Sequence, residues 1–207
     1  MATFLRDLSY RYQWLYDGIS RLAALTVGGE ARFRRLALEG IPLTADMTML
    51  DLCCGSGQAT AILVEQSAHV VGLDASPLSL QRASRNVPQA EYVESFAEST
   101  PFSDRHFDLV HTSAALHEMT TEQLQQIVQE VHRILKPGGV FTFVDFHPPS
   151  NYVFWPGISV FFYLFETETA WQFMRTNMTT LLKETGFTTI KQQLHAGGSL
   201  QVIHAQK

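Results

Sequence analysis

The chain has little cysteine, little charge and no long uninterrupted apolar run. Only two of its 207 residues are cysteine, and these are adjacent, Cys53 and Cys54, so they cannot close the long loops that disulfides stabilise in secreted proteins. Charged residues make up 17%, and the net charge of −5 argues against sequence-independent binding to nucleic-acid phosphates. We therefore expect no nucleic-acid partner and a location in the cytoplasm.

No stretch of the sequence is expected to span a membrane. The most apolar stretch, residues 152–165, is 14 residues long and is interrupted by Pro156 and Gly157. A spanning helix needs about 20 largely apolar residues. Residues 1–14 also lack the apolar core and the small-residue cleavage site of a secretory signal.

What the sequence does contain is apolar and aromatic. Hydrophobic residues make up 45%, with 14 Phe, 6 Tyr and 3 Trp. A chain this apolar buries enough surface to offset its conformational entropy, so disorder is excluded. The aromatic residues predict a large aromatic core, an apolar ligand cavity, or both.

Short apolar runs alternate with longer amphipathic runs between residues 47 and 145. This alternation predicts a doubly wound α/β sheet. The predicted strands are 49–52, 69–73, 91–93, 108–111 and 140–145, and the predicted helices are 58–65, 77–86 and 121–135. Lys136-Pro137-Gly138-Gly139 is expected to close the last of these helices.

The two ends of the chain differ from this middle part. Residues 1–44 have helical spacing of apolar residues up to Pro42. A helix is expected over residues 170–184, followed by strands 188–194 and 200–205. A glycine-containing turn separates these two strands, which predicts an antiparallel hairpin at the edge of the sheet.

The most informative stretch is MLDLCCGSGQ, residues 49–58. A strand that runs into a glycine-rich turn and then a helix places backbone amides beside a ligand at the carboxyl edge of the sheet. Gly55 and Gly57 leave room for a ligand against the backbone. Thr60 stands where a dinucleotide motif needs its third glycine, and the carboxylate of Asp51 would repel a pyrophosphate. The same carboxylate suits a ligand with an ammonium group.

A second acid, Asp74, ends the second predicted strand, 23 residues after Asp51. An acid about 20 residues downstream is placed to accept hydrogen bonds from both hydroxyls of a ribose. The site thus offers a partner for a cation, a glycine turn and a ribose acceptor. S-adenosylmethionine carries an ammonium group, a carboxylate, a ribose and a sulfonium methyl donor, so we expect it as the cofactor and expect no metal.

Four stretches resemble, in this order, the motifs of class I S-adenosylmethionine-dependent methyltransferases: LDLCCGSG, VVGLDAS, TPFSDRHFDLV and LKPGGVF. The resemblance covers residues 47–145. It implies a mostly parallel α/β sheet of seven strands in the order 3-2-1-4-5-7-6, with strand 7 antiparallel. The expected organisation is one domain, 1–207, with a helical N-terminal cap (1–44), a cofactor-binding half (45–145) and a substrate-side segment with the terminal hairpin (146–207).

The resemblance also implies which residues bind the cofactor. Tyr16 from the cap would close over the methionine carboxylate, and Ala97 would lie near adenine. Phe96 stands where the family places an Asp that receives the adenine amino group, and Cys53 stands where the family usually has Gly. The expected cofactor-binding set is Tyr16, Asp51, Cys53, Gly55, Ser56, Gly57, Asp74, Ala75, Phe96, Ala97 and Ser113.

Both ends of the chain resemble the ubiquinone/menaquinone biosynthesis C-methyltransferases, through LYDGISRLAALTVGGEARFRRLAL and LHAGGSLQVIHAQK. This resemblance implies C-methylation of a small apolar acceptor, with a prenylated quinol as the first candidate. O- or N-methylation of another metabolite and a non-catalytic S-adenosylmethionine-binding partner subunit are the alternatives. Arg32, Arg34 and Arg35 fit either a solvated helix face or a binding role.

His117 is the candidate catalytic residue. It lies in TSAALHEM, residues 112–119, where the quinone family has an Arg. An imidazole has an unperturbed pKa of about 6.5 and is neutral enough at pH 7 to accept the phenolic proton whose loss makes a quinol carbon nucleophilic. The alternative is that His117 packs over the cofactor or caps the next helix.

The aromatic segment 152–165 admits three interpretations: the wall of an apolar tunnel, a patch that touches a membrane surface, or a buried helix that completes the core.

Overall fold

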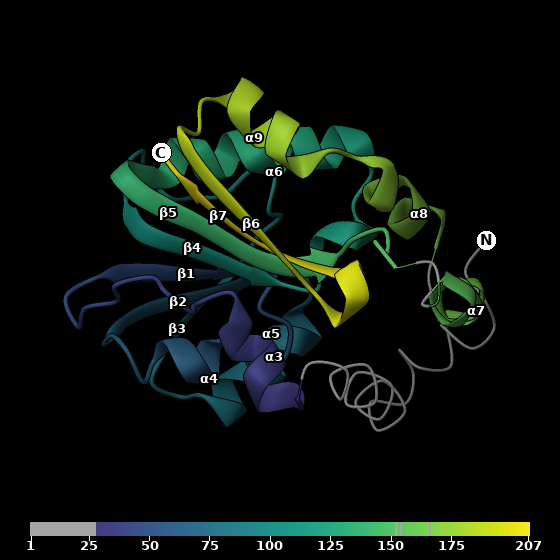
Figure 1. Ribbon diagram of the computed structural model, residues 1–207. Helices are drawn as coiled ribbons and strands as arrows, with labels where there is room; N and C mark the ends of the chain where they lie inside the picture. Colours follow the sequence, from purple (N-terminus) through teal and green to yellow (C-terminus); the bar gives the residue numbers. More distant parts are fainter. Residues whose placement is uncertain (1–27, 152, 154, 166) are drawn as a thin grey trace.

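A computed structural model describes residues 28–151, 153, 155–165 and 167–207 of the chain (Figure 1). Its strands are β1 (Thr48–Leu52), β2 (His69–Asp74), β3 (Glu91–Glu94), β4 (Phe107–Ser113), β5 (Leu135–Phe146), β6 (Thr189–His195) and β7 (Leu200–Gln206). They form one sheet of order β3-β2-β1-β4-β5-β7-β6. β7 runs antiparallel to β5 and β6, and the other neighbours pair in parallel. The predicted fold class, strand order and antiparallel hairpin are therefore confirmed.

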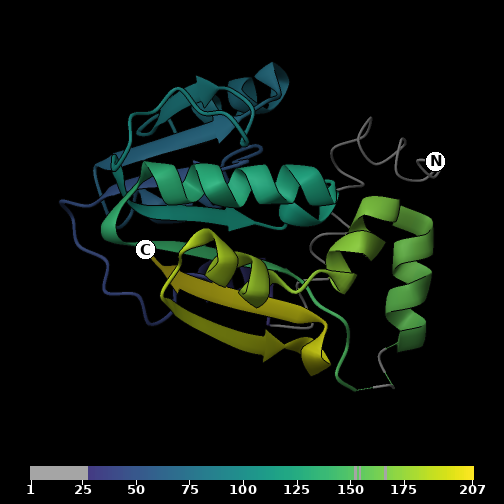
Figure 2. The ribbon, with the colours of Figure 1, turned by 90° about the horizontal axis from the view of Figure 1, so that it is seen from above.

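Helices cover both faces of the sheet. They are α3 (Glu30–Leu36), α4 (Thr60–Leu63), α5 (Pro77–Asn86), α6 (Thr121–Ile134), α7 (Trp155–Phe165), α8 (Glu168–Arg175) and α9 (Met178–Thr185). Two short 3-10 helices, η2 (Leu116–Glu118) and η4 (Ala196–Gly198), lie between elements. Figure 1 shows α6 and α9 on one face and α3, α4 and α5 on the other. In both views α7 lies beyond one end of the sheet, next to α8 (Figure 2).

Helix α6 shows how local sequence and core packing agree. Thr120 and Gln123 form a capping box at its start, in which each side chain bonds the backbone N–H of the other residue. Leu124, Ile127, Val128, Val131 and Ile134 are all buried on the face that packs on the sheet. The apolar stripe that predicted this helix is therefore the stripe that it buries.

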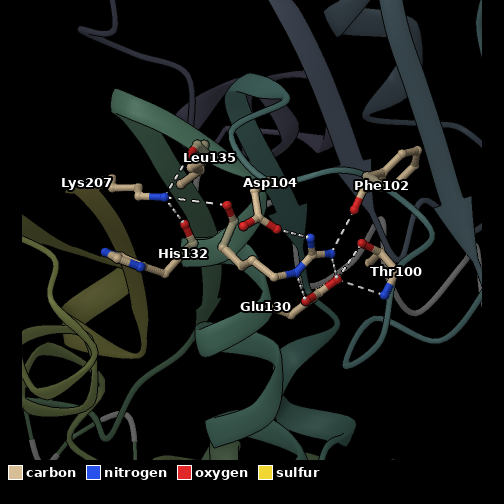
Figure 3. Close-up of polar contacts among 8 residues, drawn as sticks. Thr100, Phe102, Asp104, Glu130, His132, Leu135 and Lys207 are labelled. Carbon is tan, nitrogen blue, oxygen red and sulfur yellow. Dashed lines mark hydrogen bonds and ion pairs between the residues drawn. The ribbon is translucent and has the colours of Figure 1, made fainter.

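The end of α6 is fixed by charged side chains (Figure 3). The ammonium group of Lys207 donates to the carbonyl oxygens of His132 and Leu135, which satisfies acceptors that a helix end leaves unpaired. The Arg133 guanidinium bonds Glu130 and Asp104, and Glu130 in turn accepts the backbone N–H of Thr100 at 2.8 Å. These bonds tie the segment before β4 to α6.

Most predicted strands agree with the structure to within one or two residues at each end, whereas three other predictions differ from it in kind. The helix expected over 170–184 is two helices, because Asn177 leaves the helix and its side chain caps α9 by accepting the backbone N–H of Thr180. The helix expected over 58–65 is regular only from Thr60 to Leu63. Residues 136–139 do not cap α6 but belong to β5, since the backbone of Gly138 and Gly139 pairs with that of Lys207.

Of the predicted N-terminal cap, α3 lies within the described part, and residues 1–27 lie outside it. Among the helices that are described, none combines the length and the apolar character needed to cross a bilayer.

Candidate active site

A cavity of about 490 Å³ opens where the carboxyl ends of β1, β2 and β4 meet, and we call it the carboxyl-edge cavity. Ligands bind at this edge in open α/β sheets, because loops diverge there from neighbouring strands. The residues that line it are Arg34, Cys53, Cys54, Gly55, Ser56, Gln58, Leu73, Asp74, Ala75, Ser76, Ser79, Arg82, Ser95, Phe96, Ala97, Glu98, Ser113, Ala114, Ala115, Glu118, Met119 and Gln123.

The turn after β1 is built around Asp74. One carboxylate oxygen of Asp74 accepts the backbone N–H of Gly55, and the other accepts that of Ser76, each at 2.9 Å. These bonds hold the glycine turn against the end of β2. Gly55 has a φ of 56°, in the left-handed region that glycine adopts without strain.

Gly57 lies next to α5 and has a left-handed backbone conformation. Its φ is 86°, and a Cβ atom there would lie 3.4 Å from atoms of Ala83 and Val87 at the α5 helix. Gly57 does not line the carboxyl-edge cavity. What favours glycine at this position is its left-handed φ, and the contact of Gly57 with the cofactor stays a prediction.

Asp51 lies behind the cavity wall. Its Oδ2 accepts the hydroxyl of Thr60 at 2.6 Å, and its Oδ1 lies 3.2 Å from Nδ1 of His111. All three side chains are buried. The structure therefore gives the Asp51 carboxylate two protein partners, where the sequence analysis expected a ligand ammonium group. It also explains Thr60, whose hydroxyl fixes the start of α4 to β1.

The surroundings of the two cysteines disfavour the thiolate form. Burial, with the negative charges of Asp74 and Asp51, raises the pKa of both the Cys53 and Cys54 thiols well above the ordinary value. Both thiols therefore stay protonated near neutral pH. Cys53 has a φ of 59°, so a non-glycine residue holds the left-handed position where the resemblance implies Gly.

Phe96 is the aromatic residue among those that line the cavity. It is 66% exposed and lines the cavity next to the buried Ala97. An exposed ring is available to stack on another flat group. Glu98, the polar neighbour, lines the same end.

Arg34 enters the cavity from α3. Its Nη1 donates to Oγ of Ser113 at 3.1 Å, at the carboxyl end of β4. Its Nε is buried and has no hydrogen-bond partner in the described part of the chain. Its neighbour Arg35 is instead exposed and pairs with Glu65 at 2.9 Å. Of the two interpretations of this basic segment, Arg35 fits the solvated face and Arg34 does not.

His117 forms a buried pair with Asp145. Its Nδ1 lies 2.7 Å from Oδ1 of Asp145, and Oδ2 of the same carboxylate accepts the backbone N–H of Leu116 at 2.9 Å. The ring of His117 packs edge-on against Phe146, with centroids 4.6 Å apart. His117 is only 5% exposed and does not line the carboxyl-edge cavity.

The structure brings most of the predicted site together. Among the predicted residues, Asp51, Gly57 and His117 do not line the cavity, and Tyr16 lies outside the described residues. The predicted residues that line it are Cys53, Gly55, Ser56, Asp74, Ala75, Phe96, Ala97 and Ser113. Asp145, the partner of His117, was not among the predicted site residues. It lies at the end of a strand that pairs with β4, and this position could have indicated it.

The described side chains of the aromatic segment are divided between the core and the surface. No described residue of 153–165 lines the carboxyl-edge cavity. Phe162 is buried and contacts Phe146 and Trp171, with centroids 4.8 Å and 5.1 Å away. Val160 and Tyr163 are 59% and 77% exposed. Among the described side chains of the segment, Phe162 thus joins the core, whereas Val160 and Tyr163 are exposed.

The cavity fits S-adenosylmethionine by its size and by its donors and acceptors. Small-molecule cavities measure about 300–1,000 Å³ and combine apolar walls with a few placed polar groups. Three acids, a glycine turn, an exposed aromatic ring and two arginines line this one. In the described residues no cluster of three or more His, Cys, Asp or Glu side chains could hold a metal ion.

Sequence comparisons match this chain to methyltransferases. A family model described as a methyltransferase domain matches residues 49–139. An uncharacterized methyltransferase of Synechocystis sp. is 57% identical over 206 residues, covering 100% of this chain and 97% of that protein. A demethylmenaquinone methyltransferase of Chlorobaculum tepidum is 35% identical over 144 residues, covering 67% of this chain and 57% of that protein.

Solved structures share the fold at low identity. An S-adenosylmethionine-dependent methyltransferase from Aquifex aeolicus aligns with a TM-score of 0.62 at 18% identity, covering 84% of this chain and 88% of that one. A TehB-like methyltransferase from Corynebacterium glutamicum aligns with a TM-score of 0.66 at 15% identity, covering 97% and 98%. The matched domain, the near-full-length relative and the shared sheet lead to one assignment. This chain belongs to the S-adenosylmethionine-dependent methyltransferases.

Proposed function

We propose that this methyltransferase methylates a carbon atom of a small apolar acceptor, with a prenylated quinol as the first candidate. The observation that carries the proposal is its similarity to quinone methyltransferases. Besides the demethylmenaquinone enzyme, a 2-phytyl-1,4-naphtoquinone methyltransferase of Thermosynechococcus vestitus is 32% identical over 155 residues. We expect the reaction to take place in the cytoplasm.

The carboxyl-edge cavity supplies the residues that would hold the cofactor. Asp74 would accept the ribose hydroxyls with the lone pairs that its two backbone bonds leave unused. Gly55 and Ser56 would lie along the methionine part, while Phe96 would stack on adenine and the backbone of Ala97 would bond it. When bound, S-adenosylmethionine supplies an electrophilic methyl group on its sulfonium sulfur.

His117 is the proposed base. Asp145 accepts from Nδ1 of His117 at 2.7 Å, which fixes the tautomer that carries the proton on Nδ1 and makes Nε2 the basic nitrogen. Such a nitrogen can take the phenolic proton of a quinol and so raise electron density on the ring carbon. In the competing role His117 only holds η2 in place. His117→Gln distinguishes the two roles, because it leaves Asp145 with its backbone donors in η2.

Helix α7 is the proposed point of contact with a lipid surface that carries the acceptor. Its 11 residues include no charged side chain, and Val160 and Tyr163 are exposed on it. Apolar surface of this kind favours the interfacial region of a bilayer. Its buried Phe162 contacts Phe146, which in turn contacts His117, so the helix lies near the proposed base.

The test is incubation with S-adenosylmethionine labelled in its methyl group and a lipid extract, with the product located by mass spectrometry. Label on a ring carbon of a prenylated quinol supports the proposal. Label on an oxygen or nitrogen of another metabolite supports the alternative reaction, and label that stays on the donor with every extract contradicts the acceptor class. Replacing Val160 and Tyr163 by serine is expected to weaken vesicle binding, while Leu194→Ser, at an exposed residue of β6, is the control.

A further inference from the structure

We infer that Arg34 binds the carboxylate of the cofactor's methionine part. The inference rests on the cofactor lying in the carboxyl-edge cavity, as proposed above. It assigns a binding role to a residue of α3. The glycine turn and the acids at the strand ends give no indication of this role.

Arg34 lies at the end of the cavity where the amino-acid part of the cofactor is expected. Strand order places β2, β1 and β4 side by side, so a ligand whose ribose lies at Asp74 on β2 extends along this edge in one of two directions. Adenine lies toward Phe96, which follows β3. The amino-acid part then lies toward the end of β4, where Arg34 contacts Ser113 at 3.1 Å.

The guanidinium group of Arg34 has hydrogen-bond donors that the described residues do not satisfy. A guanidinium group has five N–H donors. Arg34 donates one to Ser113, its Nε is buried with no partner, and none of the described carboxylates pairs with it. A half-buried cation with free donors beside a cavity favours an anionic ligand group.

The guanidinium group of Arg34 and the carboxylate of the cofactor are chemically complementary. A carboxylate accepts two parallel N–H bonds from a guanidinium, and these charge-assisted bonds are about twice as strong as neutral ones. The amino-acid part of the cofactor has one carboxylate. Arg35, one residue later on the same helix, has its charge already paired with Glu65 and is exposed. The two arginines therefore form a matched pair of test and control.

The experiment measures binding rather than turnover. S-adenosylhomocysteine and its primary carboxamide are titrated into the wild-type protein and into Arg34→Met by calorimetry. The wild type is expected to bind the acid about 10- to 100-fold more tightly than the amide, a ratio that corresponds to one charge-assisted pair. Arg34→Met is expected to remove this preference, Arg34→Lys to restore part of it, and Arg35→Met to leave it unchanged.

The outcomes separate this inference from the placement of the cofactor. If the wild type binds acid and amide equally, or if Arg34→Met keeps the preference for the acid, Arg34 does not bind the carboxylate. If the wild type binds neither ligand, the placement of the cofactor itself is wrong. Because the acid–amide comparison in the wild type needs no substitution, it can overturn the inference even if Arg34→Met fails to fold.

Discussion

His117 and Asp145 form a buried contact of 2.7 Å between Nδ1 and Oδ1, and the same carboxylate accepts the backbone N–H groups of Leu116 and His117. Asp145 therefore fixes the backbone of η2 and the orientation of the imidazole at once. A carboxylate in this place orients a base in many enzymes by selecting its tautomer. The catalytic role proposed for His117 depends on this orientation, while the buried ring does not line the carboxyl-edge cavity.

Asp145→Asn tests the pair. The substitution keeps the size of the side chain but removes the charge that favours the Nδ1–H tautomer, so we expect kcat to fall by about 100-fold or more while the Kd for S-adenosylhomocysteine stays within a few-fold. His117→Gln is expected to match it. Asp108→Asn, at the amino end of β4, is the control. Full kcat in His117→Gln would leave His117 with a packing role only.

Phe96→Ala tests the adenine contact. The ring is 66% exposed, so its loss is expected to leave the free energy of unfolding nearly unchanged. Stacking of a base on an aromatic ring contributes about 1–3 kcal/mol, so the Kd for S-adenosylhomocysteine is expected to rise by about 10-fold. Leu78→Ala, at another exposed apolar residue, is the control. Equal effects of the two substitutions would argue against stacking.

Thr60→Val tests the buried support of the glycine turn. The substitution keeps the shape of the side chain but leaves Oδ2 of Asp51 without its 2.6 Å partner. An unsatisfied buried acceptor costs about 1–3 kcal/mol, which urea denaturation would show as a lower midpoint with an unchanged slope. Thr189→Val, at an exposed threonine of β6, is expected to change little. An unchanged midpoint for Thr60→Val would mean that the turn does not depend on this bond.

The cysteines are expected to resist alkylation in the folded protein. Burial and nearby carboxylates raise the pKa of both thiols, so the thiolate that reacts with iodoacetamide is scarce at pH 8. Mass spectrometry is expected to show labelling at least about 10-fold slower than in denaturant. Rapid labelling of Cys53 in the native state would contradict the assignment of a protonated thiol.

His204 predicts a loss of stability in mild acid. Its Nε2 lies 3.0 Å from the carbonyl oxygen of Ala37, and burial lowers the pKa of its imidazole below the unfolded value of about 6.5. The unfolded chain then binds the proton more readily, so stability is present above this pH and declines as the pH falls through it. His204→Gln is expected to make the denaturation midpoint less dependent on pH between about 7.5 and 5.5. A pH dependence equal to that of the wild type would assign the effect to other groups, such as His132.

Local sequence determined most of the elements of this protein and the approximate place of its site. The capping box and apolar stripe of α6 depend on residues within one segment. Helix α5 has the predicted bounds, 77–86, and its N-cap Ser76 directly precedes it in the chain. The glycine turn and Asp74 follow their strands directly, so the end of each strand located them.

The tertiary structure decided which side chains meet. Asp51 and His111 lie 60 residues apart in sequence, yet they pair in register on β1 and β4. Asp145 reaches His117 for the same reason, because β5 lies beside β4. Arg34 reaches Ser113 only once α3 packs on the sheet. Periodicity carries no information on these partners, since it records which face a residue occupies and not which residue lies opposite on a strand distant in sequence.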